Sequence, residues 1–229
     1  MLASGRGSNL QALIDHFHAL GERRAGDIVL VASDRPDAHA LTRAATAGIA
    51  TATIASRRAP AGDDLGALLE RHRIDLLALA GYLQLVPAEI TRAYAGRVVN
   101  VHPGPLPAFG GPGMYGSRVH RAVLASGRPF GGPTIHFVDE QYDHGATIAF
   151  WPVPVLAGDD EHALADRVLR AEHLLFPRVV QAVAGGLVRL EASGTVSAPF
   201  IRDASSLLPL DPRLDDSSLS RILDAAHSA

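Results

Sequence analysis

Short apolar runs alternate with segments of helical periodicity along the first half of this chain. The apolar runs occupy residues 27–31, 74–79 and 98–101, and the helical patterns occupy residues 9–20, 38–47 and 65–72. Near-continuous apolar strands that alternate with helices are typical of parallel sheets covered by helices on both faces. The sequence therefore predicts an α/β fold with a mostly parallel sheet. Its first apolar run, residues 1–3, is shorter than the about 5–6 residues of an ordinary strand.

The pattern changes late in the chain. Residues 133–138 and 146–155 are β-prone runs with no helix between them, so we expect an antiparallel edge there. Residues 161–184 carry apolar side chains at helical spacing, and a glycine pair ends this longest predicted helix. A final strand is predicted at residues 187–190.

Composition supports one globular domain followed by a tail. The chain has 229 residues, of which 47% are hydrophobic and 20% are charged. That is enough for one domain with a sizeable core, which we place at residues 1–192. Residues 193–229 are rich in Ser, Asp and Pro and are predicted to form a C-terminal extension with one short helix near residues 219–226.

Several classes of function are excluded or disfavoured. The sequence has no cysteine, which excludes disulfide scaffolds, thiolate zinc sites and cysteine nucleophiles, and it has no lysine, which excludes Schiff-base chemistry. A net charge of −3 does not indicate the basic surface of a nucleic-acid-binding protein. No run approaches the roughly 18 apolar residues of a membrane span, and no signal-peptide pattern begins the sequence. We therefore expect a soluble cytoplasmic protein that binds neither nucleic acid nor membrane, as a monomer or homodimer.

Asn100 and His102 are the first candidate catalytic residues. They follow an apolar run, and residues two apart on a strand point to the same face. Pro103 comes next and stops the strand. An amide beside an imidazole suits acyl-type chemistry, because one group stabilises a developing oxyanion and the other moves a proton. From the spacing alone, a hydrogen-bonded structural histidine is equally consistent.

Two further segments have the composition of site loops. Residues 4–10, Ser-Gly-Arg-Gly-Ser-Asn-Leu, join the first strand to the first helix, and we expect Ser8 and Asn9 to cap that helix. Exposed amides at a helix N-terminus suit a phosphate, although a tight turn without ligand fits equally well. Residues 139–145 form an acidic loop whose carboxylates could orient His102, or could simply be solvated. His136 alternates with apolar residues, which places it on one face of a strand as a structural or site-lining residue.

Metal and serine-hydrolase chemistry find little support. The chain has eleven histidines but no His-Glu-x-x-His, and His120, His144, His162 and His173 do not form a ligand-spaced cluster. No Gly-x-Ser-x-Gly occurs. We predict no metal site.

Together, the ordered motifs resemble the phosphoribosylglycinamide formyltransferase family. The likeness covers roughly residues 1–190: Ser-Gly-Arg-Gly-Ser-Asn-Leu-Gln at residues 4–11, Asn-Val-His-Pro at residues 100–103 with Leu-Pro-Ala-Phe at residues 106–109, and Ile-His-Phe-Val at residues 135–138 followed by Asp143. The resemblance implies a Rossmann-like fold and a catalytic domain over residues 1–192, with a nucleotide-binding N-terminal half and a folate-binding C-terminal half. It implies transfer of the formyl group of 10-formyltetrahydrofolate, as co-substrate, to the amine of glycinamide ribonucleotide in purine synthesis.

The resemblance also implies a role for each matching residue. Asn100 would bind the oxyanion, His102 would transfer the proton and Asp143 would position the histidine. Residues matching the glycinamide ribonucleotide site are Gly7, Ser8, Asn9 and Glu172. Residues matching the folate site are Arg58, Leu83, Gln84, Leu85, Val86, Asn100, Asp139, Glu140, Gln141, Tyr142 and Asp143.

Residues 110–117, Gly-Gly-Pro-Gly-Met-Tyr-Gly-Ser, depart from the family by forming a longer loop than its usual Pro-Gly turn. Three alternatives share the central motif or the fold. Methionyl-tRNA formyltransferase adds a tRNA-binding domain, whereas this tail carries few arginines. Formyltetrahydrofolate deformylase transfers the formyl group to water, and a non-catalytic folate- or nucleotide-binding relative would transfer nothing.

Overall fold

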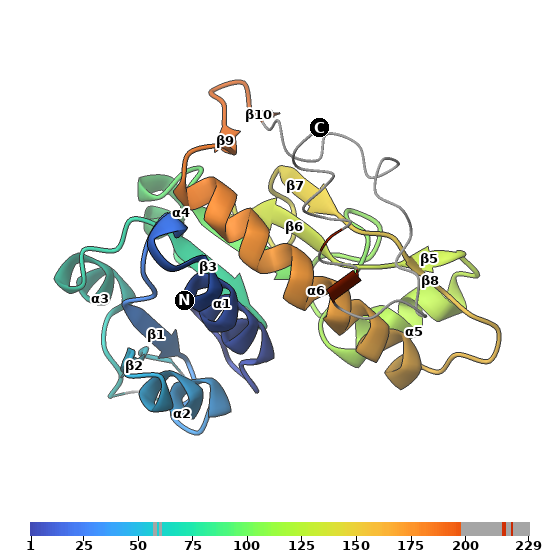
Figure 1. Cartoon of the computed structure of the whole chain (residues 1–229), viewed down its shortest axis with the longest axis horizontal. Coiled ribbons are helices and arrows are strands. Elements are labelled where there is room, and N and C mark those ends of the chain that lie inside the picture. The colour runs from blue at the N-terminus through green and yellow to red at the C-terminus, as the bar shows by residue number, and fades with distance from the viewer. Residues whose placement is uncertain (57–58, 60, 198–216, 219–220, 222–229) are drawn as a thin grey trace.

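The computed structural model describes residues 1–56, 59, 61–197, 217–218 and 221 (Figure 1). Arg58 lies outside the described residues. So do most of the predicted extension from residue 193 and, apart from residue 221, its predicted helix.

The central sheet is a mostly parallel sheet with an antiparallel end. In spatial order its strands are β2 (Ala50–Thr53), β1 (Leu30–Ser33), a short segment at Leu2, β3 (Leu77–Ala80), β4 (Val98–His102), β6 (Thr134–Phe137) and β7 (Thr147–Phe150). The members from β2 to β4 run parallel, β6 pairs antiparallel with β4, and β7 pairs antiparallel with β6. The predicted α/β class and its antiparallel late strands are confirmed.

Helices cover both faces of the sheet because its strands are apolar on both sides. Along β3 and β4, Ala78 and Val99 pack into one hydrophobic core, whereas Leu77 and Val98 pack into another. The first core lies under α1 (Ser8–Leu20), α5 (Ser117–Ala125) and α6 (Glu161–Ala184), and the second under α3 (Leu65–Arg71) and α4 (Ala88–Ala93). Helix α2 (His39–Thr46) packs beside β1 and β2, and a 3-10 turn (Gly21–Arg23) follows α1. Figure 1 shows α6 lying beside α1 on the same face of the sheet.

Several element boundaries differ from the prediction. The run at residues 146–155 is not one strand: Pro152 has no N–H to donate, and the chain leaves β7 to form β8 (Val153–Pro154), which pairs with β5 (Phe130–Gly131). The predicted final strand is β9 (Arg189–Leu190), which pairs with β10 (Val196–Ser197) outside the central sheet. The strand expected at residues 27–31 begins at Leu30.

The N-cap prediction for the first helix is also wrong. The cap residue of α1 is Gly7, with a φ of 72°, and Ser8 and Asn9 lie inside the first turn. A Cβ on Gly7 would meet the Cα of Ala40 at 2.8 Å, so close packing on α2 requires a glycine there. The described part of the chain has no helix long and apolar enough to cross a membrane.

Candidate active site

Strand β4 places two polar side chains at the carboxyl end of the parallel strands. Asn100 and His102 lie on the same face of β4, and the strand ends where Pro103 follows. The antiparallel register sets His136 of β6 directly opposite Asn100, with Asn100 Nδ2 3.1 Å from His136 Nε2. The open end of a parallel sheet is where α/β proteins bind their ligands.

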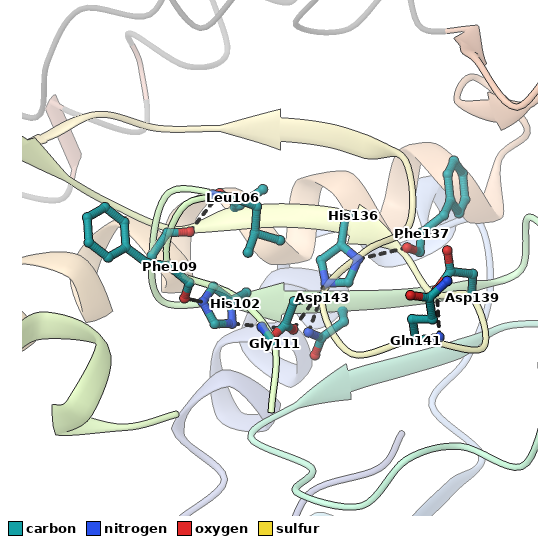
Figure 2. Close-up of polar contacts among 12 residues, drawn as sticks. His102, Leu106, Phe109, Gly111, His136, Phe137, Asp139, Gln141 and Asp143 are labelled. Atoms are coloured by element: carbon teal, nitrogen blue, oxygen red, sulfur yellow. Dashed lines mark hydrogen bonds and ion pairs between the residues drawn. The ribbon is translucent and has the colours of Figure 1, made fainter. Parts of the chain in front are cut away.

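His102 lies between two oxygen acceptors. Its Nε2 is 2.8 Å from the carbonyl oxygen of Phe109, and its Nδ1 is 3.4 Å from Oδ1 of Asp143 (Figure 2). Carbonyl and carboxylate oxygens only accept hydrogen bonds, so both contacts are satisfied only when both ring nitrogens carry protons. The site is therefore built to accommodate an imidazolium at position 102.

Asp143 lies in the loop after β6 and contacts both histidines. Its Oδ1 is 3.7 Å from Nε2 of His136, and its Oδ2 accepts a hydrogen bond from the backbone N–H of Gly111 at 3.0 Å (Figure 2). Burial alone would raise the pKa of Asp143, but the hydrogen bond and the positive charge of His102, together with the hydrogen bond from the N–H of Gly111, lower that pKa well below its usual range. The carboxyl group therefore stays ionised at neutral pH.

Glu172 of α6 is a second buried carboxyl group in the same cleft. Its side chain accepts a hydrogen bond at 2.7 Å from Nδ2 of Asn9, in the first turn of α1. Burial raises the pKa of Glu172 to about 7, although the hydrogen bond from Asn9 and the charge of His102 both act to lower it. Beside it, the N–H groups of Ser8 and Asn9 precede the first hydrogen bond of α1, from Gln11 to Gly7, and have no acceptor within the helix.

A cleft of about 870 Å³ joins these groups. It brings together nine of the predicted site residues: Gly7, Ser8, Asn9, Leu83, Asn100, His102, Tyr142, Asp143 and Glu172. The long loop also lines it through residues 111–117. The cleft thus holds the turn at the start of α1 near one carboxyl group, and an amide, an imidazole and a second carboxyl group at the end of β4.

Six of the predicted folate residues do not line this cleft. Val86 is buried in a hydrophobic core, and Gln84 donates a hydrogen bond to Asp34 at 3.3 Å. Leu85 is exposed, and Glu140 pairs with Arg92 at 2.6 Å. Asp139 contacts His144 at 2.6 Å and accepts a hydrogen bond from the backbone N–H of Gln141.

His120 also belongs to this site, although the sequence patterns did not indicate it as a site residue. This histidine of α5 lines the cleft and is 5% exposed, and no hydrogen-bond partner contacts its Nδ1. Burial and then the charge of His102 lower the pKa of His120 to about 4, so the ring is neutral at pH 7. Its position beside Val119 and Val123 on an amphipathic segment is the signal that could have placed it. Among the described residues, no cluster of three or more His, Asp or Glu side chains could hold a metal ion.

Comparison with known proteins identifies the family. A family model described as formyl transferase matches residues 1–180. Two chloroplastic phosphoribosylglycinamide formyltransferases match: that of Arabidopsis thaliana is 38% identical, with 85% of this chain and 68% of that protein covered, and that of Vigna unguiculata is 41% identical, with 80% and 59% covered. A solved phosphoribosylglycinamide formyltransferase of Anaplasma phagocytophilum matches with a TM-score of 0.77 and 31% identity, over 89% of this chain and 93% of that one. The chain belongs to the formyl transferase family.

Proposed function

We infer that this chain transfers a formyl group from 10-formyltetrahydrofolate to the primary amine of glycinamide ribonucleotide. In the reaction, the amine nitrogen bonds to the formyl carbon and a tetrahedral oxyanion forms. The bond from that carbon to the tetrahydrofolate nitrogen then breaks, and the proton lost by the amine is taken up by the leaving nitrogen. The products are formylglycinamide ribonucleotide and tetrahydrofolate.

One observation carries the proposal: Asn100, His102 and Asp143 meet at the end of β4, in the cleft that also holds the Gly7–Asn9 turn. The Asn100 amide would donate a hydrogen bond to the oxyanion, which is the charge that develops in the transition state. The His102 imidazolium would also donate to it, through Nε2, after this nitrogen exchanges the carbonyl oxygen of Phe109 for the oxyanion. His102 would also move the proton, and Asp143 would hold the imidazolium through its Nδ1.

The acceptor nucleotide would occupy the side of the cleft formed by α1 and α6. Its phosphate would bind the free N–H groups at the start of α1, where Gly7 allows the close turn. Glu172 would bind the glycinamide amine, and its pKa of about 7 suits a group that exchanges a proton near neutral pH. Asn9 joins the two parts because it belongs to the turn and donates to Glu172.

The folate would lie on the side of the cleft away from α1 and α6, against Leu83 and Tyr142, which line the same cleft as Asn100 and Asp143. Leu83 and Tyr142 are large and exposed, so a flat pterin ring would cover their apolar surface. We propose residues 1–192 as the catalytic domain and the residues after 192 as an extension outside it.

An absorbance assay of 10-formyltetrahydrofolate consumption, with and without glycinamide ribonucleotide, tests the proposal. Turnover that requires the nucleotide, with formylglycinamide ribonucleotide as the product, supports it. Equal turnover without the nucleotide, with formate as the product, would identify a deformylase instead. Absence of turnover in a folded protein that still binds folate would identify a non-catalytic relative.

A further inference from the structure

We propose that His136 is a positioning residue that fixes the orientation of the Asn100 amide, so that an N–H rather than the carbonyl oxygen is available to the oxyanion. The proposal rests on the proposed formyl transfer, in which Asn100 stabilises that oxyanion. His136 would act through Asn100 without touching the reacting atoms.

The fold holds the two side chains together. His136 is the residue of β6 that stands opposite Asn100 of β4, and the two side chains approach to 3.1 Å between Nδ2 and Nε2. His136 is 1% exposed, so water does not compete for its ring nitrogens. The pairing of β6 with β7 shifts register between Ile135 and His136, an irregularity of the kind that re-aims a side chain beside a site.

The second nitrogen of His136 sets the tautomer. Nδ1 is 2.7 Å from the carbonyl oxygen of Phe137, which can only accept a hydrogen bond (Figure 2). Nδ1 must therefore carry the proton, and in a neutral ring Nε2 is left with a lone pair. That lone pair faces Asn100, so the amide has to present its N–H₂ group to His136.

The lone pair of His136 Nε2 therefore fixes where the two N–H groups of Asn100 lie. One N–H of Asn100 donates to His136, and the other remains for a ligand in the cleft that Asn100 lines. If the Asn100 amide were rotated by half a turn, its oxygen would face the lone pair of His136 Nε2, and two acceptors would oppose each other. The N–H₂ group would then leave the position from which it donates to the oxyanion. Such a flip loses a buried hydrogen bond as well as the oxyanion donor.

Asp143 competes with Asn100 as the partner of His136 Nε2. Its Oδ1 is 3.7 Å from His136 Nε2, beyond an ordinary hydrogen bond, whereas Asn100 is within range. A proton on Nε2 would redirect His136 towards Asp143 and leave Asn100 without its acceptor. The two arrangements differ in which nitrogen is protonated, and this difference can be measured.

Long-range ¹H–¹⁵N correlation spectra of the full chain with labelled histidine test the tautomer directly, with the His136→Gln variant used to assign the signals. We expect Nδ1 of His136 to have the shift of a protonated nitrogen and Nε2 the shift of an unprotonated one, at pH 7 without substrates. A protonated Nε2, alone or together with Nδ1, overturns the proposal. This result does not depend on whether the chain transfers formyl groups.

Kinetics of two variants at the same position test the effect on Asn100. His136→Phe retains a ring and removes the acceptor, so we expect kcat to fall about 10–100-fold, as for a weakened oxyanion donor, with KM values nearly unchanged. His136→Gln can accept through its side-chain oxygen and should recover most of that loss. His18→Phe makes the same change at an exposed position of α1 and should behave as the unmodified protein. Equal losses in the Phe and Gln variants, or a rise in KM alone, contradict the proposal.

Discussion

Two carboxyl groups line one cleft, one buried and one largely buried, and their surroundings move their pKa values in opposite directions. Asp143, in the loop after β6, is contacted by two histidines and a backbone N–H, and its pKa lies far below the usual range. Glu172, in the middle of α6, has Asn9 as its hydrogen-bond donor, and its pKa is raised to about 7. Burial pushes both pKa values upward, so the number and charge of the donors decide the outcome.

This difference matches the roles proposed for the two residues. An ionised Asp143 would be a fixed counter-charge for the imidazolium that His102 is proposed to form during the transfer. A carboxyl group that titrates near pH 7 can exchange a proton with an amine at little cost. One cleft thereby holds a group that keeps its charge and a group that changes it, as paired carboxyl groups with different environments do in other enzymes.

Removing the charge of Asp143 should have the largest effect. In Asp143→Asn the contact with His102 Nδ1 remains possible but the counter-charge is lost, so we expect kcat to fall by about 10³-fold or more. Substrate binding should persist, because the proposed nucleotide contacts lie on α1 and α6. Single-turnover kinetics with separate binding measurements check this, and near-normal turnover would remove Asp143 from the mechanism.

The pH dependence of stability should show opposite signs for the two groups. The pKa of Glu172 is higher in the folded chain than in the unfolded one, so its stabilising contribution is complete below about pH 4.5 and is lost as the pH rises to about 7. The loss amounts to about 3 kcal/mol. The pKa of Asp143 is lowered, so its contribution is present above pH 4 and is lost as the pH falls further.

Urea unfolding between pH 3 and pH 8 measures both contributions. Glu172→Gln should remove most of the decline between pH 4.5 and 7, and Asp143→Asn should reduce the decline below pH 4. Glu70→Gln, at an exposed position of α3, serves as the control for loss of a carboxyl group. A decline between pH 4.5 and 7 that persists in Glu172→Gln would assign it to another group.

Glu172→Gln should also weaken use of the nucleotide. The amide keeps the size and can still accept from Asn9, but it cannot pair with a charged amine or take its proton. We expect kcat/KM for glycinamide ribonucleotide to fall about 10–100-fold, with KM for the folate close to that of the unmodified chain. A loss confined to the folate KM would place Glu172 in the wrong subsite.

The smallest effect should come from packing behind Asp143. A Cβ on Gly110 would collide with the side chain of Leu106 and lie 2.8 Å from the Cβ of Asp143. Gly110→Ala should therefore displace the carboxylate and lower kcat by about tenfold, with little change in KM. Gly26→Ala adds a Cβ that meets nothing within 4 Å and should leave kcat unchanged. Equal kcat values for both variants would show that this close contact does not position Asp143.

The fold was largely predictable because its signals are local. Strands buried on both faces read as continuous apolar runs, and α6 has the bounds that its periodicity and terminal glycines predict. Helices α4 and α5 and strand β2 were not recognised. They are short, and α5 follows directly on a glycine-rich loop, so periodicity had few residues in which to appear.

The site was predictable where residues stand close in sequence and much less so elsewhere. The spacing of Asn100 and His102 placed them on one face, but their contacts with His136 and Asp143 depend on a strand register and a loop that no local pattern specifies. The Asn9–Glu172 hydrogen bond spans 163 positions and arises only when α1 packs against α6. The same packing buries Glu172 and raises its pKa.

A ¹³C NMR titration of the side-chain carboxyl groups of Asp and Glu measures the two pKa values separately, with Asp143→Asn and Glu172→Gln used to assign the two signals. Between pH 4 and pH 8, we expect a Glu172 signal that titrates with a pKa of about 7 and an Asp143 signal that does not change. Titration of Asp143 within this range, or of Glu172 near the ordinary value of about 4.3, would contradict the division of charge between the two carboxyl groups.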